Sequence, residues 1–156
     1  TVFAHHPDVN GKWINIGRLD MNTSGLLLFT NNGDIANALM HPSSKIKRVY
    51  EVSLKGNITK EKIVLSKKGI DIGKGEIGKF LNIVQFNNEL PNTYKVTLIT
   101  GKNREIRRVF DSLDCKVVKL KRIKYALVEL SNLKINKYRS LNREEMRGII
   151  KYIKND

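Results

Sequence analysis

The sequence predicts an α+β fold, in which helices flank one mixed or largely antiparallel sheet. Three observations support this fold class. Many runs have the length and the apolar or alternating pattern of strands, a few segments have helical periodicity behind a capping residue, and the two kinds are interspersed along the chain. The 156 residues contain no internal repeat and no low-complexity linker, so we expect residues 1–156 to form one domain.

In the first half of the chain we expect strands at residues 13–16, 25–30 and 48–55 and a helix at residues 34–40. The run GLLLFT at 25–30 is apolar throughout, and the turn sequence NNG follows it. The helix ends before Pro42, which cannot continue it. The run RVYEVSLK at 48–55 alternates between apolar and polar residues, as expected of a half-buried strand.

In the second half we expect strands at residues 80–86 and 94–100, two strands within 116–130, and helices capped by Thr59, Asn103 and Asn142. Residues 67–79, rich in Gly and Lys, predict strands joined by turns. They include the pattern G-x-G-x-x-G at 73–78, typical of dinucleotide-binding loops. Here the pattern does not lie between a strand and a helix, so it indicates a hairpin turn.

The balance of charge favours a polyanionic partner. There are 29 Lys and Arg against 15 Asp and Glu, a net charge of +14 at pH 7. Basic side chains set against phosphates release condensed counterions, so RNA or DNA suits this charge. Solubility tuning or a lysine-rich codon bias explains the charge equally well. No long amphipathic basic helix suits a membrane surface, and no signal peptide or run of 18 apolar residues occurs. We therefore expect a cytoplasmic protein without a membrane partner.

The residues that commonly hold metals or form disulfides are few. The single cysteine, Cys115, excludes an internal disulfide, and we interpret it as a structural residue at a strand entry. His5 and His6 have no Cys, Asp or Glu at ligand spacing, and His41 before Pro42 indicates a helix terminus. We expect neither a metal nor a cofactor.

Helical geometry separates the side chains of the helix that follows Asn103. Ile106, Val109, Phe110 and Leu113 cluster on one face, which is the expected buried face. Arg108 points nearly opposite, toward solvent, and Arg107 lies on the shoulder of the apolar face. On geometry alone a snorkelling surface arginine is the favoured interpretation of Arg107, and an arginine paired with a carboxylate or phosphate is the alternative.

The loop GRLD at 17–20 follows the first predicted strand and ends in Asp20. Taken alone, Asp20 is interpreted equally well as a helix cap or as an Asx turn before Thr23 and Ser24. The same interpretation applies to Asp8 and Asp34. Local pattern alone therefore does not assign chemistry to any of these carboxylates.

Three segments in order change this interpretation: GRLDMNTSGLLLFTNNGDIANALMHP at 17–42, RVYEVSLKG at 48–56 and TGKNREIRRVF at 100–110. Together they resemble the motifs of the RsuA-type pseudouridine synthases, and residues 119–141 look like the closing strands of that family. The resemblance extends over nearly the whole chain. It implies the catalytic fold of that family, a largely antiparallel mixed sheet with flanking helices and an active-site cleft.

The resemblance also implies roles for individual residues. Asp20 matches the catalytic aspartate, Tyr50 the tyrosine that packs on the uracil ring, and Arg107 the arginine that pairs with the catalytic carboxylate. Arg18 matches a residue implicated in displacing the target nucleotide from its stack. Lys102 stands where Arg is more usual. The remaining expected substrate-binding residues are Lys102, Asn103, Arg104, Ile106 and Arg108.

The implied activity is the isomerisation of a uridine in bacterial ribosomal RNA, without a cofactor. Details of the motifs are most similar to the family members that act on 23S rRNA of the large subunit. A synthase for 16S rRNA and a non-catalytic rRNA-binding or assembly protein are the alternatives. We expect a monomer that represents the catalytic domain of a longer enzyme, because the N-terminal S4-type RNA-binding domain and the first family motif are absent.

Overall fold

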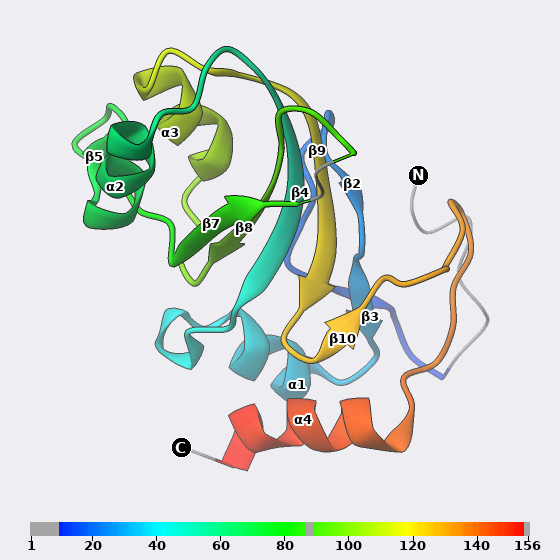
Figure 1. Cartoon of the computed structure of the whole chain (residues 1–156). Helices are drawn as coiled ribbons and strands as arrows, with labels where there is room; N and C mark the ends of the chain where they lie inside the picture. Colours follow the sequence, from blue (N-terminus) through cyan, green and yellow to red (C-terminus); the bar gives the residue numbers. More distant parts are fainter. Residues whose placement is uncertain (1–9, 87–88, 155–156) are drawn as a thin grey trace.

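The computed structural model describes residues 10–86 and 89–154, and its elements alternate irregularly along the chain (Figure 1). Its strands are β1 (Ile14–Ile16), β2 (Ser24–Gly25), β3 (Leu28–Thr30), β4 (Arg48–Lys55), β5 (Ile70–Asp71), β6 (Ile77–Gly78), β7 (Asn82–Gln85), β8 (Thr93–Leu98), β9 (Lys116–Tyr125) and β10 (Val128–Glu129). Its helices are α1 (Gly33–Met40), the 3₁₀ helix η2 (Pro42–Ser44), α2 (Lys60–Lys68), α3 (Glu105–Ser112) and α4 (Arg143–Lys154). The predicted α+β class is confirmed.

A six-stranded mixed sheet organises the fold. Five strands pair antiparallel in the order β10-β9-β4-β8-β7, and β2 joins β9 in parallel. Two small antiparallel pairs, β1 with β3 and β5 with β6, lie outside this sheet. Helices α2 and α3 lie beside the upper part of the sheet and α1 and α4 lie near its lower end (Figure 1). The helices thus cover different parts of one sheet.

Two hydrophobic clusters follow from this arrangement. The first packs α3 against β4, β8 and β9, with Phe80 and Phe110 fully buried and their ring centroids 5.2 Å apart. The second packs α1 and α4 around Leu39, Val128 and Ile149. Apolar positions at helical and strand spacing form both clusters, as the sequence pattern predicts. The cleft described below is lined in part by the same sheet face that carries the first cluster.

The apolar run at 25–30 is not one strand, contrary to the prediction. Its first part is β2 and pairs with β9, whereas its last three residues are β3 and pair with β1. At Gly25 the backbone has φ +106°, and a Cβ atom there would lie 2.1 Å from the carbonyl oxygen of Arg122. Only glycine permits this approach. The chain therefore pairs with β9 as far as Leu26 and crosses to the β1–β3 pair before Leu28.

Predicted turns and caps agree with the structure except at α3. The Thr59 side chain accepts a hydrogen bond from the Lys62 backbone, and the Asn142 side chain accepts one from the Glu145 backbone. Residues 73–76 form the turn between β5 and β6. Cys115 is buried directly before β9, as predicted. The predictions for His5, His6 and Asp8 concern residues that lie outside the described ranges.

The predicted cap of α3 was wrong. The N-cap is Arg104 rather than Asn103, and it has φ 52° with no side-chain cap. The first helical residue, Glu105, instead accepts hydrogen bonds from the backbone that precedes it.

Among the described residues, no helix is both long and apolar enough to cross a membrane.

Candidate active site

A cleft of about 370 Å³ lies over the exposed end of the sheet. One wall is the loop that joins β1 to β2, and the other is the segment that enters α3 together with the first turns of that helix. The floor is made by β4, β8 and β9. Six basic residues line the cleft against two acidic ones: Arg18, Arg48, Lys102, Arg104, Arg107 and Arg122 against Asp20 and Glu105.

Asp20 lies in the β1–β2 loop and lines the cleft. Its carbonyl oxygen accepts a hydrogen bond of 2.9 Å from the Thr23 backbone, which closes a turn around the carboxylate. Its carboxylate is 25% exposed and lies 3.5 Å from the guanidinium of Arg18, which is 82% exposed. Such an exposed pair contributes little stability, so Arg18 is free to exchange Asp20 for another anion.

Tyr50 lies half-buried on β4 and lines the floor of the cleft. In register it faces Val96 on β8 and Arg122 on β9. An irregularity in the pairing of β4 with β9 falls directly before Tyr50. The sheet therefore presents this aromatic side chain at the point where the regular ladder is interrupted.

Arg107 comes from the first turn of α3 and reaches the opposite wall. Its Nη2 donates a hydrogen bond of 2.7 Å to the carbonyl oxygen of Asn22, two residues after Asp20. This bond ties α3 to the Asp20 loop across 85 residues of sequence. The structure thus brings Asp20, Tyr50 and Arg107 to one cleft, as the resemblance implied.

The expected ion pair between Asp20 and Arg107 is not formed. Among the described residues, Asp20 pairs with Arg18 and Arg107 bonds to backbone. The Nε atom of Arg107 is buried without a hydrogen-bond partner. Arg107 consequently keeps one donor unused at the edge of the cleft.

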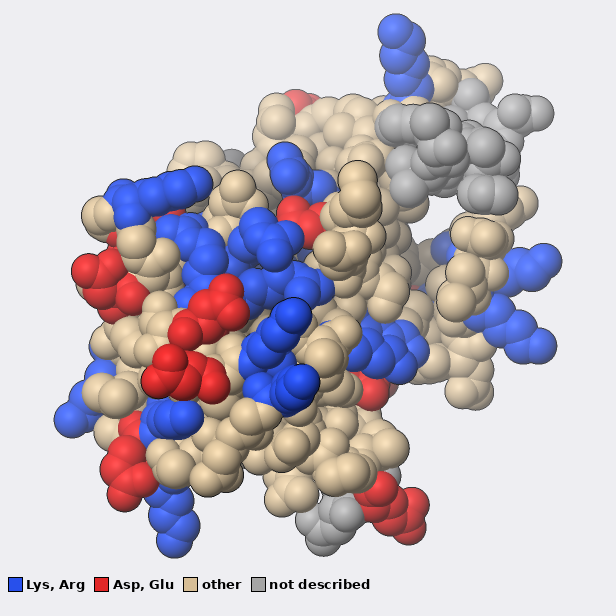
Figure 2. Space-filling view, turned by 90° about the horizontal axis from the view of Figure 1, so that it is seen from above, with Lys and Arg blue, Asp and Glu red and all other residues tan. Residues whose placement is uncertain are grey.

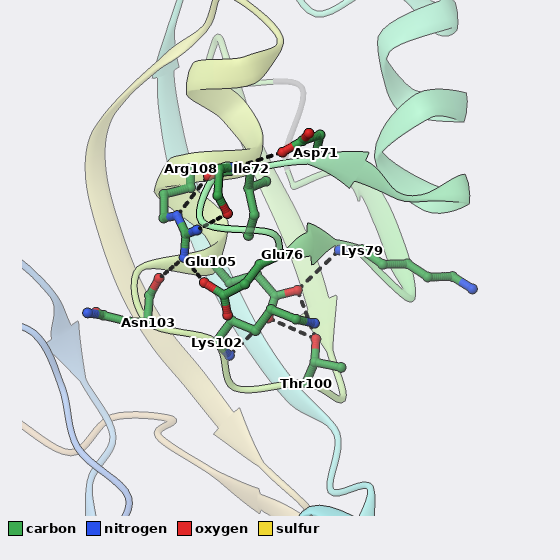
Figure 3. A network of polar contacts seen from close by, with 10 residues as sticks. Asp71, Ile72, Glu76, Lys79, Thr100, Lys102, Asn103, Glu105 and Arg108 are labelled. Carbon is green, nitrogen blue, oxygen red and sulfur yellow. Dashed lines mark hydrogen bonds and ion pairs between the residues drawn. The ribbon is translucent and has the colours of Figure 1, made fainter.

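The orientation predicted for Arg108 was wrong. Its side chain is only 18% exposed and does not line the cleft. It forms an ion pair of 2.9 Å with Glu76 and donates to the carbonyl oxygens of Ile72, Gly73 and Asn103 (Figure 3). The β5–β6 hairpin packs against α3 and covers a face that an isolated helix would expose. Arg108 therefore fixes the hairpin to α3.

Within the cleft wall, Glu105 organises the segment that enters α3 (Figure 3). This carboxylate is 3% exposed and accepts hydrogen bonds from the Thr100 hydroxyl and from the backbone of Lys79 and Lys102. These bonds hold the backbone that presents Lys102, Asn103 and Arg104 to the cleft. Ile106, 3% exposed, contributes an apolar part of the same wall.

Two arginines on the floor were missed by the sequence analysis. Arg122 is 3% exposed, donates 2.8 Å from Nε to the Leu26 carbonyl oxygen, and lies 5.5 Å from the ring centroid of Tyr125. Arg48 donates 2.7 Å to the Thr100 carbonyl oxygen. The alternation of β9, in which Leu120 and Arg122 share a face, was a signal that one of its basic residues points inward.

Tyr125 completes the floor beside these arginines. Burial raises the pKa of its hydroxyl, whereas the positive charges of Arg48 and Arg122 partly offset that rise. Tyr50 raises the pKa slightly further. The positive charges of both arginines therefore act on the Tyr125 hydroxyl at the bottom of the cleft.

Comparison with known proteins identifies the family. Residues 5–112 match the RNA pseudouridylate synthase family. The chain is 43% identical over 147 residues to ribosomal large subunit pseudouridine synthase B of Buchnera aphidicola subsp. Schizaphis graminum, covering 91% of this chain and 57% of that protein. It is 42% identical over 132 residues to the protein of the same name from Vibrio vulnificus, covering 83% of this chain and 41% of the relative.

A solved structure supports the same conclusion. A crystal structure of a pseudouridylate synthase matches with a TM-score of 0.86 and 26% identity, over 96% of this chain and 65% of that one. The chain thus spans less than two thirds of these relatives' length, while most of it matches them. The family implied by the motifs is confirmed: the chain belongs to the RNA pseudouridylate synthases.

Proposed function

We propose that this chain isomerises a uridine of ribosomal RNA to pseudouridine, with Asp20 as the nucleophile, and that the RNA is the 23S rRNA of the large subunit. The observation that carries the proposal is the convergence of Asp20, Tyr50 and Arg107, from three distant segments, on one basic cleft. The relatives named large subunit synthase B support the choice of 23S over 16S rRNA.

The chemistry suits these three side chains. Isomerisation breaks the C1′–N1 bond, turns the uracil, and rejoins it to C1′ through C5, which needs no redox step. The Asp20 carboxylate attacks the sugar, as carboxylates do in other glycosyl transfers. Tyr50 offers a ring face on which the detached uracil stacks. Arg107 positions the loop that carries Asp20 through its bond to Asn22.

The basic rim suits the RNA backbone. Lys and Arg side chains gather across the middle of the face seen from above (Figure 2). Arg18, Lys102 and Arg104 border the cleft itself and offer phosphate contacts there. The target base must leave its helix before it enters the cleft, which costs a few kcal/mol. We propose that Arg18 fills the vacated space and offsets part of this cost, in a cytoplasmic, monomeric enzyme.

The test is carbodiimide mapping of pseudouridine in rRNA. Cells that lack the gene should lose one pseudouridine in 23S rRNA, and the wild-type gene should restore it. Loss of a 16S site would instead identify a small-subunit enzyme. An unchanged pattern, together with retained binding of the chain to rRNA, would identify a non-catalytic rRNA-binding or assembly protein.

A further inference from the structure

The cleft contains nearly all of the unsatisfied polar atoms in the described part of the chain. Four buried side-chain nitrogen or oxygen atoms lack a hydrogen-bond partner there: Asn15 Oδ1, Arg48 Nε, Arg107 Nε and Arg122 Nη2. Three of the four belong to arginines that line the cleft. A buried donor without a partner is unfavourable in a native fold, and a bound acceptor is one way to satisfy it.

Arg122 is held most firmly of these three. It is 3% exposed, its Nε is bonded to the Leu26 carbonyl oxygen, and its guanidinium lies 5.5 Å from the ring centroid of Tyr125. β2 also pairs with β9 at Arg122 through Gly25. A side chain fixed on so many sides has a preset orientation, which is what a charge-stabilising group requires.

Its place relative to Tyr50 indicates what it would bind. Arg122 and Tyr50 are direct register partners on neighbouring strands. Such partners have Cβ atoms about 4.5–5.5 Å apart, so they address the same ligand. The phosphates of an RNA backbone would meet the exposed Arg18 and Arg104 at the rim. Arg122 is 3% exposed and lines the floor, so the group nearest to it would be one inserted into the cleft, such as a base.

We propose that Arg122 is a further catalytic residue, whose guanidinium binds a carbonyl oxygen of the uracil as it detaches; this rests on the proposed function. When the C1′–N1 bond breaks, its electron pair stays with N1 and spreads onto O2 and O4, while an Asp20 oxygen bonds to C1′. Rejoining forms the C5–C1′ bond and releases the carboxylate, and C5 then loses a proton while N1 gains one. Arg122 stabilises the negative ring between these two steps.

The test compares wild-type chain with Arg122→Met, Arg122→Lys and Lys119→Met, using a 23S fragment that the wild type modifies. Lys119 is the matched control because it is exposed on β9, beside Ser53 rather than Tyr50. We expect Arg122→Met to slow single-turnover cleavage of the C1′–N1 bond by about 100- to 1000-fold. The Kd for RNA should stay within about twofold, and Arg122→Lys should recover part of the rate.

The decisive experiment compares the rate defect of Arg122→Met on the uridine RNA with its defect on an RNA that carries 5-fluorouridine at the target position. Fluorine withdraws electrons from the ring and stabilises its anion, so the defect of Arg122→Met should shrink by about tenfold or more. An equal defect on both RNAs would overturn the proposal. Weaker RNA binding by Arg122→Met, with the slope of log binding constant against log salt concentration reduced by about one, would also overturn the proposal. That result is expected when a phosphate contact is lost.

Thermal melts separate folding from chemistry. If Arg122→Met fails to fold, the comparison of the two RNAs is made with Arg122→Lys, which retains the charge, and the same shrinkage of the defect is expected. A wild-type chain that modifies no rRNA overturns the proposed function and this inference with it. An active wild type with fully active Arg122 variants overturns the inference alone.

Discussion

Two polar regions meet at α3 and differ in how completely their groups are paired. Behind the helix, the network of Glu105 and Arg108 binds the β5–β6 hairpin and the Thr100 segment, and none of its buried side-chain atoms lacks a partner. In front, the cleft keeps three arginine nitrogens unpaired. In the first region every buried side-chain polar group is bonded within the fold, whereas in the second three buried donors have no partner within the described residues.

The comparison predicts that substitutions in the cleft abolish activity and leave stability intact. Asp20→Asn preserves shape and removes the charge of a side chain whose ion pair within the described residues is with the exposed Arg18. We expect the rate to fall by on the order of 10⁴-fold or more, as for other lost nucleophiles. The Tm should stay unchanged. Single-turnover assays with melts check both, and a near wild-type rate would exclude Asp20 as the nucleophile.

Neighbouring arginines of α3 give the sharpest contrast between the two regions. Arg108→Met removes hydrogen bonds to three carbonyl oxygens and the ion pair with Glu76, so stability should fall by about 2–3 kcal/mol. Arg107→Met removes one bond to Asn22 and an unpaired Nε, so stability should change by less than about 1 kcal/mol. The rate should nevertheless drop by about 100-fold.

Urea denaturation and single-turnover rates of both variants measure this contrast. Under saturating RNA and at a temperature where both fold, Arg108→Met should turn over at close to the wild-type rate. If the two variants lose stability and activity in the same proportion, the division between network and cleft does not hold.

Substitutions at Tyr50 distinguish the role of its ring from the role of its hydroxyl. If the ring stacks on uracil, Tyr50→Phe keeps the stacking face and should stay close to wild type. Tyr50→Ala should lose about 1–3 kcal/mol, or roughly 5- to 150-fold in kcat/KM. Steady-state kinetics on the same RNA provide the measurement. If Tyr50→Phe is as inactive as Tyr50→Ala, the hydroxyl rather than the stacking ring is the group that the reaction requires.

The smallest effect is expected at a fully paired site far from the cleft. Arg139 binds both oxygens of Glu145, at 2.7 and 2.9 Å, and this bond lowers the pKa of the carboxyl below its usual value. Because the folded-state pKa is lowered, the stabilisation is present above the unfolded pKa of about 4.3 and is lost as the pH falls through the folded value.

We therefore expect Glu145→Gln to be less stable by about 1 kcal/mol at pH 7, with the difference shrinking as the pH falls below about 4.3 and through the lowered folded-state pKa. Urea titrations of both proteins across this range measure it. A difference that persists at acid pH would mean that the amide breaks the α4 cap rather than the charge pair.

Local pattern predicted most elements because their causes are local. Thr59 and Asn142 cap helices through side chains a few residues away, and the 48–55 alternation reflects burial of one face of β4. The errors arose where distant segments decide the outcome. Gly25 divides an apolar run because β9 pairs with its first part, and the β5–β6 hairpin covers Arg108.

The candidate site was predicted in part for the same reason. Motif resemblance identified Asp20, Tyr50 and Arg107 because each sits in a contiguous signature, and the cleft unites them. Arg48 and Arg122 also lie in matched segments, but their place on the cleft floor depends on burial and on unpaired atoms that only the folded chain reveals. The Asp20–Arg107 pair was expected from resemblance, yet the loop turns Asp20 toward Arg18 instead.

The close approach of Gly25 to the β9 backbone limits which residues position 25 can accept. A side chain there would have to displace the β9 backbone at Arg122, whatever its polarity, and the loop that carries Asp20 begins only a few residues earlier. In a saturation library selected for function, position 25 should therefore tolerate as few substitutions as position 20, although Gly25 has no chemistry of its own. Intolerance to mutation in this chain will report backbone proximity as readily as catalysis.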